Sequence, residues 1–138
     1  MTTSVRSQPC IACPYRRDVP SGVWSAQEYD KLVDYDSPTS EQPFAPFACH
    51  ATPEHFCHGW AVVHSNRGHA YELLALRIAR LDVEDVPMAG VALFQSGYQV
   101  AKHGKADIED PSDEAIEMAE RLINKYMRLQ RRHRDDPR

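Results

Sequence analysis

The 138-residue chain lacks any long apolar run. No stretch approaches the roughly 20 apolar residues that a membrane-spanning helix requires, and the polar start of the chain lacks the apolar segment of a secretory signal peptide. We therefore expect a cytoplasmic protein with no membrane partner. In that compartment cysteine thiols stay reduced, which argues against a disulfide framework.

The chain also lacks the common catalytic motifs. It has no C-x3-C-x2-C of radical enzymes, no phosphate-binding glycine loop and no G-x-S-x-G. Five of the seven histidines lie between His50 and His69, but none forms an i, i+4 pair on a clear helix with a carboxylate partner, as a hydrolytic zinc site requires. Enzymatic activity is left uncertain, and a non-enzymatic role is favoured.

Cysteine is scarce and clustered. The four cysteines Cys10, Cys13, Cys49 and Cys57 follow the pattern C-x2-C, 35 intervening residues, C-x7-C, with Pro14 directly after the second. Two thiol pairs at this spacing are typical of a four-thiolate metal site that joins irregular segments. We therefore take all four as candidate ligands of a metal or metal cofactor.

The spacing leaves the identity of the cofactor open. Structural zinc sites usually draw on two short pairs, whereas an iron–sulfur cluster accepts uneven spacing, and proline recurs after a ligand in ferredoxin-type sequences. The sequence therefore favours a [4Fe–4S] cluster over Zn²⁺. Disulfides, unliganded thiols and a Cys3His site completed by His50 or His58 are further alternatives. A thioredoxin-like redox pair is disfavoured, because no hydrophobic strand precedes Cys10.

Several residues near the cysteines are predicted to surround such a site. Arg16 and Arg17 could offset the negative charge of a cluster and donate hydrogen bonds to sulfur, or form surface ion pairs with Asp18. Phe44 and Phe47 could shield the site from water. The predicted shell consists of Arg16, Arg17, Trp24, Phe47, His50, His58 and Trp60.

Proline is more frequent than glycine, with ten against six, and most prolines precede residue 60. Because proline interrupts helices and central strands, the N-terminal half is expected to be irregular and loop-rich. The predicted fold is a small, mainly α single domain, 1–138. In it a four-cysteine metal site organises a loop region of about 8–62, and a helical region follows over about 68–134.

Two short helical segments are predicted in the N-terminal half. Ser25 followed by Glu28 forms a capping box and predicts a helix that ends near residues 34–36. Thr52 and Pro53 predict one further helical turn, which would bring the last two cysteines toward one side.

Three helices are predicted in the C-terminal half. The first runs from about 69 to 81 with Ile78 on its buried face, and the second begins after Ser96 and ends at Gly104. Asp110 and the proline after it are expected to open a long final helix. The apolar positions predicted to form one face of that helix are Ile116, Ala119, Leu122, Ile123, Tyr126 and Met127.

Five sequence motifs resemble those of a small actinobacterial and actinophage family of unknown function. They are Pro9-Cys10-Ile11-Ala12-Cys13-Pro14-Tyr15-Arg16-Arg17-Asp18, Ser21-Gly22-Val23-Trp24, Tyr35-Asp36, Phe47-Ala48-Cys49-His50 and Cys57-His58-Gly59-Trp60. The resemblance extends weakly to Gly104 and covers most of residues 9–104. It implies the four cysteine ligands and carries no activity.

The turn Gly22-Val23-Trp24 is also similar to the one by which WhiB-like iron–sulfur regulators dock on the primary sigma factor, although the order of cysteines and turn differs. This looser analogy implies a [4Fe–4S] regulator or protein-interaction module with sigma factor or RNA polymerase as candidate partner. Contact with DNA could come from Arg128, Arg131, Arg132 and Arg134. The alternatives are a zinc-stabilised interaction module without a redox role and a cluster-bearing enzyme that processes nucleic acid.

Overall fold

The computed structural model describes residues 4–83, 86–87 and 89–135 and is mainly helical, with a loop-rich N-terminal half, as the sequence predicts. Its elements are β1 (Ser4–Val5), α1 (Ala26–Asp34), η1 (Thr39–Glu41), β2 (His55–Phe56), α2 (His58–Ser65), η2 (His69–Tyr71), α3 (Leu74–Ala79), α4 (Gly97–Lys105) and α5 (Asp113–Asp135), where η1 and η2 are 3₁₀ turns. Within this part of the chain, no helix has the length and apolar character needed to span a bilayer.

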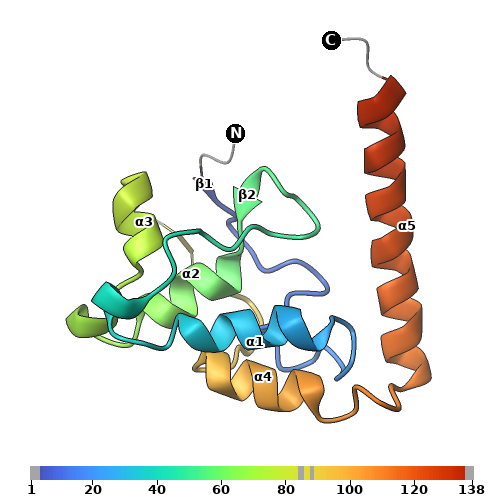
Figure 1. Ribbon diagram of the computed structural model, residues 1–138, viewed down its shortest axis with the longest axis horizontal. Coiled ribbons are helices and arrows are strands. Elements are labelled where there is room, and N and C mark those ends of the chain that lie inside the picture. Colours follow the sequence, from blue (N-terminus) through green and yellow to red (C-terminus); the bar gives the residue numbers. More distant parts are fainter. Residues whose placement is uncertain (1–3, 84–85, 88, 136–138) are drawn as a thin grey trace.

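Helices α1 and α4 pack against each other and lie side by side in Figure 1. The two helices approach closely because α4 presents glycines to α1. A Cβ atom at Gly97 would lie 1.9 Å from the carbonyl oxygen of Leu32, and one at Gly104 would lie 2.2 Å from the ring of Tyr29. The predicted role of Gly104 as the end of the helix is therefore wrong: it lies inside α4, where it makes room for Tyr29.

Side-chain caps define the start of both helices, as predicted. The hydroxyl of Ser25 accepts a hydrogen bond from Glu28 N at 3.3 Å, and that of Ser96 accepts one from Gln99 N at 3.1 Å. A third cap was not predicted: the carboxylate of Asp36 accepts from Gly97 N at 2.8 Å and from Tyr98 N at 2.7 Å. The end of α1 is thereby fixed to the start of α4.

The core extends from these helices to the cysteine loops. Its largest fully buried side chains include Trp60 of α2, Tyr15 of the first cysteine loop, Leu32 of α1 and Val100 of α4. All four cysteines belong to the same buried cluster. Core packing and the candidate metal site are therefore continuous.

The predicted helix over 69–81 is shorter than expected. The structure has η2 and α3 instead, because side chains from 39–42 bind the backbone between them: Thr39 Oγ1 donates to Glu72 O at 2.7 Å, and Gln42 Oε1 accepts from Leu74 N at 2.9 Å. Ile78 is exposed rather than buried.

Two other predictions near chain turns are wrong in detail. Residues 53–54 form a turn that leads into β2, not a helical turn. The last helix begins at Asp113 rather than after Asp110, because the hydroxyl of Ser112 accepts from Ala115 N at 3.1 Å and caps it.

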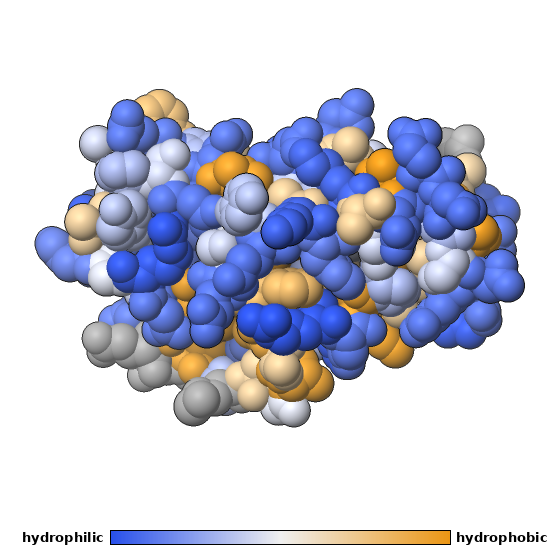
Figure 2. Space-filling model, turned by 90° about the horizontal axis from the view of Figure 1, so that it is seen from below, coloured by the Kyte–Doolittle hydropathy of each residue, from blue (hydrophilic) through white to orange (hydrophobic). Residues whose placement is uncertain are grey.

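Figure 2 shows the molecule from below, the side on which α4 lies in Figure 1. Figure 2 shows this face as mostly hydrophilic, with hydrophobic residues in separate patches. Helix α5 leaves the body here, and its C-terminal half stands apart from the rest of the molecule (Figure 1).

Candidate metal centre

The first cysteine pair lies on a tight turn in the N-terminal loop. Cys13 N donates to Cys10 O at 3.1 Å, and Arg16 N donates to Cys13 O at 3.0 Å. A distant segment holds this turn in place, since Phe94 N donates to Tyr15 O at 2.8 Å. The position of the first pair therefore depends on a segment about 80 residues away in the sequence, a long-range contact that hydrophobic periodicity does not reveal.

The second pair lies on two extended segments that run antiparallel. Cys49 N donates to His55 O and Cys57 N donates to Phe47 O, both at 2.8 Å. Cys57 is also the N-cap residue of α2, with φ −60° and ψ 126°. Backbone pairing therefore brings Cys49 and Cys57 together, and α2 fixes the direction in which the chain leaves Cys57.

All four thiols are free and buried, and they contact one another across the two loops. The sulfur atoms of Cys13 and Cys57 are 3.8 Å apart. The thiols of Cys10 and Cys49 shift one another's pKa and so interact as a second pair, and charge interactions link Cys10 to Cys13 and to Cys57. The four cysteines that the sequence singles out therefore share one buried cluster.

Within each pair the pKa values of the two thiols are shifted in opposite directions. The hydrogen bond from Cys10 lowers the pKa of Cys49 to about 4 against the opposing effect of burial, with further help from the side chain and backbone of Thr52. The hydrogen bond from Cys57 lowers the pKa of Cys13 in the same way. The thiols of Cys10 and Cys57 have raised pKa values, because each donates to its partner and is buried.

Backbone hydrogen bonds also converge on the sulfurs. They come from Tyr15 and Gly59 to Cys13, from Ala51 and Thr52 to Cys49, from Trp60 to Cys57 and from Ala12 to Cys10. Such donors favour the thiolate form, which is the form that binds metals. The donor set therefore fits a soft metal ion.

The distance between Cys13 and Cys57 can be compared with a metal site. Two thiolates on one tetrahedral zinc ion, each about 2.3 Å from it, lie about 3.8 Å apart. The observed separation is 3.8 Å. Across the described residues, however, no group of three or more His, Cys, Asp or Glu side chains is arranged to hold a metal ion. The sulfurs contact as two pairs rather than as a closed tetrahedron.

Arg6 approaches this cluster and was not predicted. Its guanidinium lies 3.8 Å from Cys49 Sγ and 3.3 Å from Thr52 Oγ1. The carbonyl of Arg6 is 2.9 Å from Nδ1 of His58, which is buried and follows Cys57. The β1–β2 pairing places Arg6 here, and that parallel pairing of two-residue strands leaves no pattern in the sequence.

Of the two arginines predicted to lie near the cysteines, one does and the other does not. Arg16 approaches the cysteines, with Nη1 3.5 Å from Cys10 O, and also forms an ion pair with Asp18 at 2.7 Å. Arg17 does not face the site: it donates to Leu93 O at 3.0 Å and lies over the ring of Phe94.

The aromatic residues predicted to surround the site also differ in their burial. Trp60 is fully buried and Phe47 is buried, whereas Phe44 is exposed and does not shield the site. Trp24 is half-buried, and its indole donates to Ala12 O at 3.1 Å between the first two cysteines. Its ring lies 4.5 Å from that of His50, which follows Cys49. Trp24 therefore joins the two cysteine loops.

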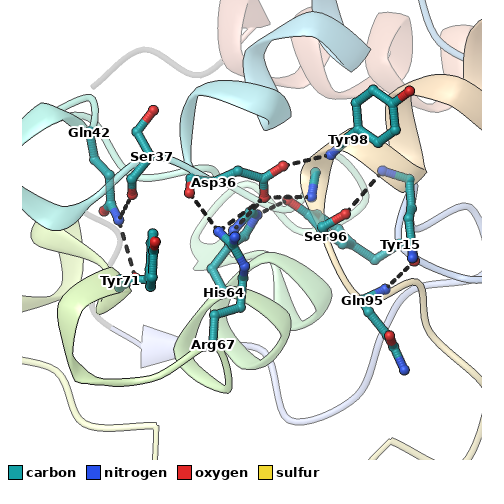
Figure 3. Close-up of polar contacts among 12 residues, drawn as sticks. Tyr15, Asp36, Ser37, Gln42, His64, Arg67, Tyr71, Gln95, Ser96 and Tyr98 are labelled. Atoms are coloured by element: carbon teal, nitrogen blue, oxygen red, sulfur yellow. Dashed lines mark hydrogen bonds and ion pairs between the residues drawn. The ribbon is translucent and has the colours of Figure 1, made fainter.

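A buried polar chain lies behind the first loop and was also missed. The hydroxyl of Tyr15 lies 2.6 Å from Nε2 of His64, and Nδ1 of His64 lies 3.4 Å from the carboxylate of Asp36. Asp36 stands between His64 and Arg67 on one side and the start of α4 on the other (Figure 3). Burial lowers the pKa of His64 to about 4, and Asp36 only partly offsets this effect. His64 is therefore neutral at pH 7, and the chain joins α1, α2 and α4 to the first cysteine loop.

A hollow of about 930 Å³ lies elsewhere, between α2, α3 and the segment before α4. Apolar side chains and the charged groups of Glu72, Arg77, Arg80 and Asp82 line it. Among its described lining residues there is no cysteine and no histidine. It is separate from the thiol cluster.

The comparisons with known proteins give a family and no activity. No significant match was found among curated proteins or among solved structures. A family model described as a family of unknown function (DUF6283) matches residues 5–128, a range that includes all four cysteines and the Tyr15, Asp36 and His64 chain. The chain therefore belongs to the DUF6283 family of unknown function.

Proposed function

We propose that Cys10, Cys13, Cys49 and Cys57 bind a metal through four thiolates and that the protein is a metal-stabilised interaction module. The observation that carries this proposal is the contact between the two loops at the 3.8 Å separation of Cys13 and Cys57. The metal would replace the thiol–thiolate hydrogen bonds and join the loops. Because the loop-rich half has little regular structure, metal binding would contribute directly to its folding.

The same separation favours a single tetrahedral ion such as Zn²⁺. Ligands of a [4Fe–4S] cluster bind different iron atoms, so they must lie further apart than two ligands of one ion. Four protein ligands also leave no open position on zinc, as in structural rather than catalytic sites. This favours an interaction role over an enzymatic one.

A [4Fe–4S] cluster is the second candidate, and the position of Arg6 favours it. A guanidinium beside Cys49 Sγ would donate a hydrogen bond to a cluster thiolate and raise the reduction potential of the cluster. The apolar surroundings of Phe47, Phe56 and Trp60 would limit access of water. In this case the module would act as a redox-responsive regulator.

The proposed partner is a protein of the transcription machinery, such as sigma factor or RNA polymerase, with DNA as a further candidate. The turn that precedes Trp24 supports this choice by its similarity to the docking turn of WhiB-like regulators. Trp24 contacts Ala12 and His50 and also packs with Met118 and Leu122 of α5, so a partner that reaches the half-buried Trp24 would meet both cysteine loops and the beginning of α5. Reduced thiols require a reducing compartment, which we propose is the cytoplasm.

Metal and acid-labile sulfide analysis of protein purified without oxygen tests the proposal. We expect one zinc ion per chain, no sulfide and no visible absorption. Iron with a matching amount of acid-labile sulfide would instead support the second candidate, a [4Fe–4S] cluster. Folded protein with no bound metal and four freely titratable thiols would overturn both.

A further inference from the structure

Among the described residues, the first part of helix α5 packs against the body. Ala115 is fully buried against Val19 and Val23, and Met118 and Leu122 pack on the same small cluster together with Trp24. The C-terminal half of the helix stands apart from the rest of the molecule in Figure 1. The apolar face of α5 is therefore covered over about two turns, the distance from 115 to 122.

A second apolar stripe on α5 is exposed. Ile116, Ile123 and Met127 are 43%, 59% and 51% exposed, and Tyr126 is 58% exposed. Positions 116, 123 and 126–127 lie on one side of a helix, offset from the buried residues, with Ala119 between them. Large apolar side chains repeated at this spacing are typical of a helix that packs against another helix.

Charge along α5 is divided between its two halves. Asp113, Glu114, Glu117 and Glu120 occupy the first part, whereas the bases begin at residue 121. The bases with described side chains are Arg121, Lys125, Arg128, Arg131 and Arg132. This division also suits the helix dipole, but the dipole acts only within the first and last turns.

We propose that α5 pairs antiparallel with α5 of a second copy of this chain. Antiparallel pairing would place the acidic half of each helix beside the basic half of the other while the two apolar stripes meet. Parallel pairing would oppose like charges along the whole length. A nucleic acid would be attracted by the basic half only and would leave the apolar stripe exposed.

A single helix pair is small compared with the roughly 1,600 Å² of a standard interface, so the dimer should be reversible with a dissociation constant in the micromolar range. The pairing uses no cysteine and does not depend on the metal. Failure of one proposal therefore leaves the other untouched.

Sedimentation equilibrium of the full chain tests this proposal across a range of concentrations. We expect a transition from the 15.7 kDa monomer to twice that mass. Ile123→Asp should weaken dimerisation at least tenfold, because it places a charge in the apolar stripe. Asn124→Asp adds the same charge at the next exposed position, off the stripe, and should change dimerisation much less.

Charge reversal tests the inter-subunit pairing. A variant with Glu117→Lys and Glu120→Lys, and another with Arg128→Glu and Arg131→Glu, should each stay monomeric, whereas their mixture should form a heterodimer. Recovery in the mixture excludes misfolding as the cause. A wild-type chain that stays monomeric throughout, equal effects of the two aspartate substitutions, or a monomer that binds duplex DNA through α5 would overturn the proposal.

Discussion

At the residue scale, Gly59 decides how closely the two cysteine loops approach. It lies in the first turn of α2, two residues after Cys57, and faces the first loop. A Cβ atom there would lie 2.5 Å from Cβ of Tyr15 and 2.9 Å from Sγ of Cys13. Tyr15 and Cys13 are both buried and cannot move aside without shifting the first loop. Only glycine therefore permits the observed contact between Cys13 and Cys57.

We predict that Gly59→Ala separates the loops and destabilises the protein by about 1–3 kcal/mol, the usual cost of overpacking. Thermal unfolding and metal content of the purified variant provide the measurement. Gly90→Ala is the matched control, because a Cβ at Gly90 meets nothing within 4 Å. Equal behaviour of the two variants would contradict the role of Gly59.

His64 should make stability depend on pH. Burial lowers its pKa to about 4 from an ordinary value of 6.5, so the unfolded chain binds a proton at higher pH than the folded one. The contribution is complete above about pH 6.5 and is lost as the pH falls toward 4.

We predict that His64→Gln reduces the loss of stability between pH 7 and pH 5, as measured by urea unfolding. Protonation of the thiolates affects wild type and variant alike, so the difference between them isolates His64. Asn124→Gln, which changes an exposed amide without adding or removing a titratable group, should leave the pH dependence as in wild type. A wild-type slope retained in His64→Gln would show that another group titrates.

At the element scale, the contact of α1 with α4 depends on small residues in α4. In isolation Gly104→Ala would favour the helix by about 1 kcal/mol. The added Cβ would lie 2.2 Å from the ring of Tyr29, which is buried and cannot turn away freely. Overpacking typically costs about 1–3 kcal/mol, so the steric effect should exceed the gain in propensity.

We therefore predict that Gly104→Ala lowers the free energy of unfolding, as measured by denaturant titration. Lys102→Ala, at an exposed position of the same helix, serves as control and should be nearly neutral. A stabilised Gly104→Ala would mean that α1 and α4 are not in close contact.

Sequence patterns located the elements whose signals are local. Ser25 and Ser96 could be recognised as caps because the side chain bonds a backbone group three residues away. The break between η2 and α3 could not, because Thr39 and Gln42 reach it from a distant loop. The same limit applies to the site: the cysteines stand out by spacing, whereas Arg6 and His64 reach their places through pairing and packing of distant segments.

At the scale of the whole molecule, the thiol cluster joins the loop-rich half to the helices. The first loop, the second pair and α2 meet there, and the same buried core continues into α1 and α4. Few backbone hydrogen bonds within regular elements hold the N-terminal loops, since β1 and β2 have two residues each. A bound metal would therefore order this half most strongly.

We predict that adding a chelator speeds amide hydrogen exchange in the two cysteine loops, residues 6–24 and 43–57, more than in α1 and α4. Hydrogen exchange with mass spectrometry measures both regions in the same sample. An equal increase in exchange rate across the chain, or no change on chelation, would contradict the proposal that a metal holds the two loops together.

X-ray absorption at the edge of the bound metal tests the four-thiolate assignment most directly. We predict four sulfur ligands at about 2.3 Å, with a single zinc ion as the favoured metal. An iron edge with additional bridging sulfide would support the second candidate on the same cysteines. A coordination shell of nitrogen or oxygen, or fewer than four sulfurs from the chain in the folded protein, would contradict a metal site formed by the four thiolates.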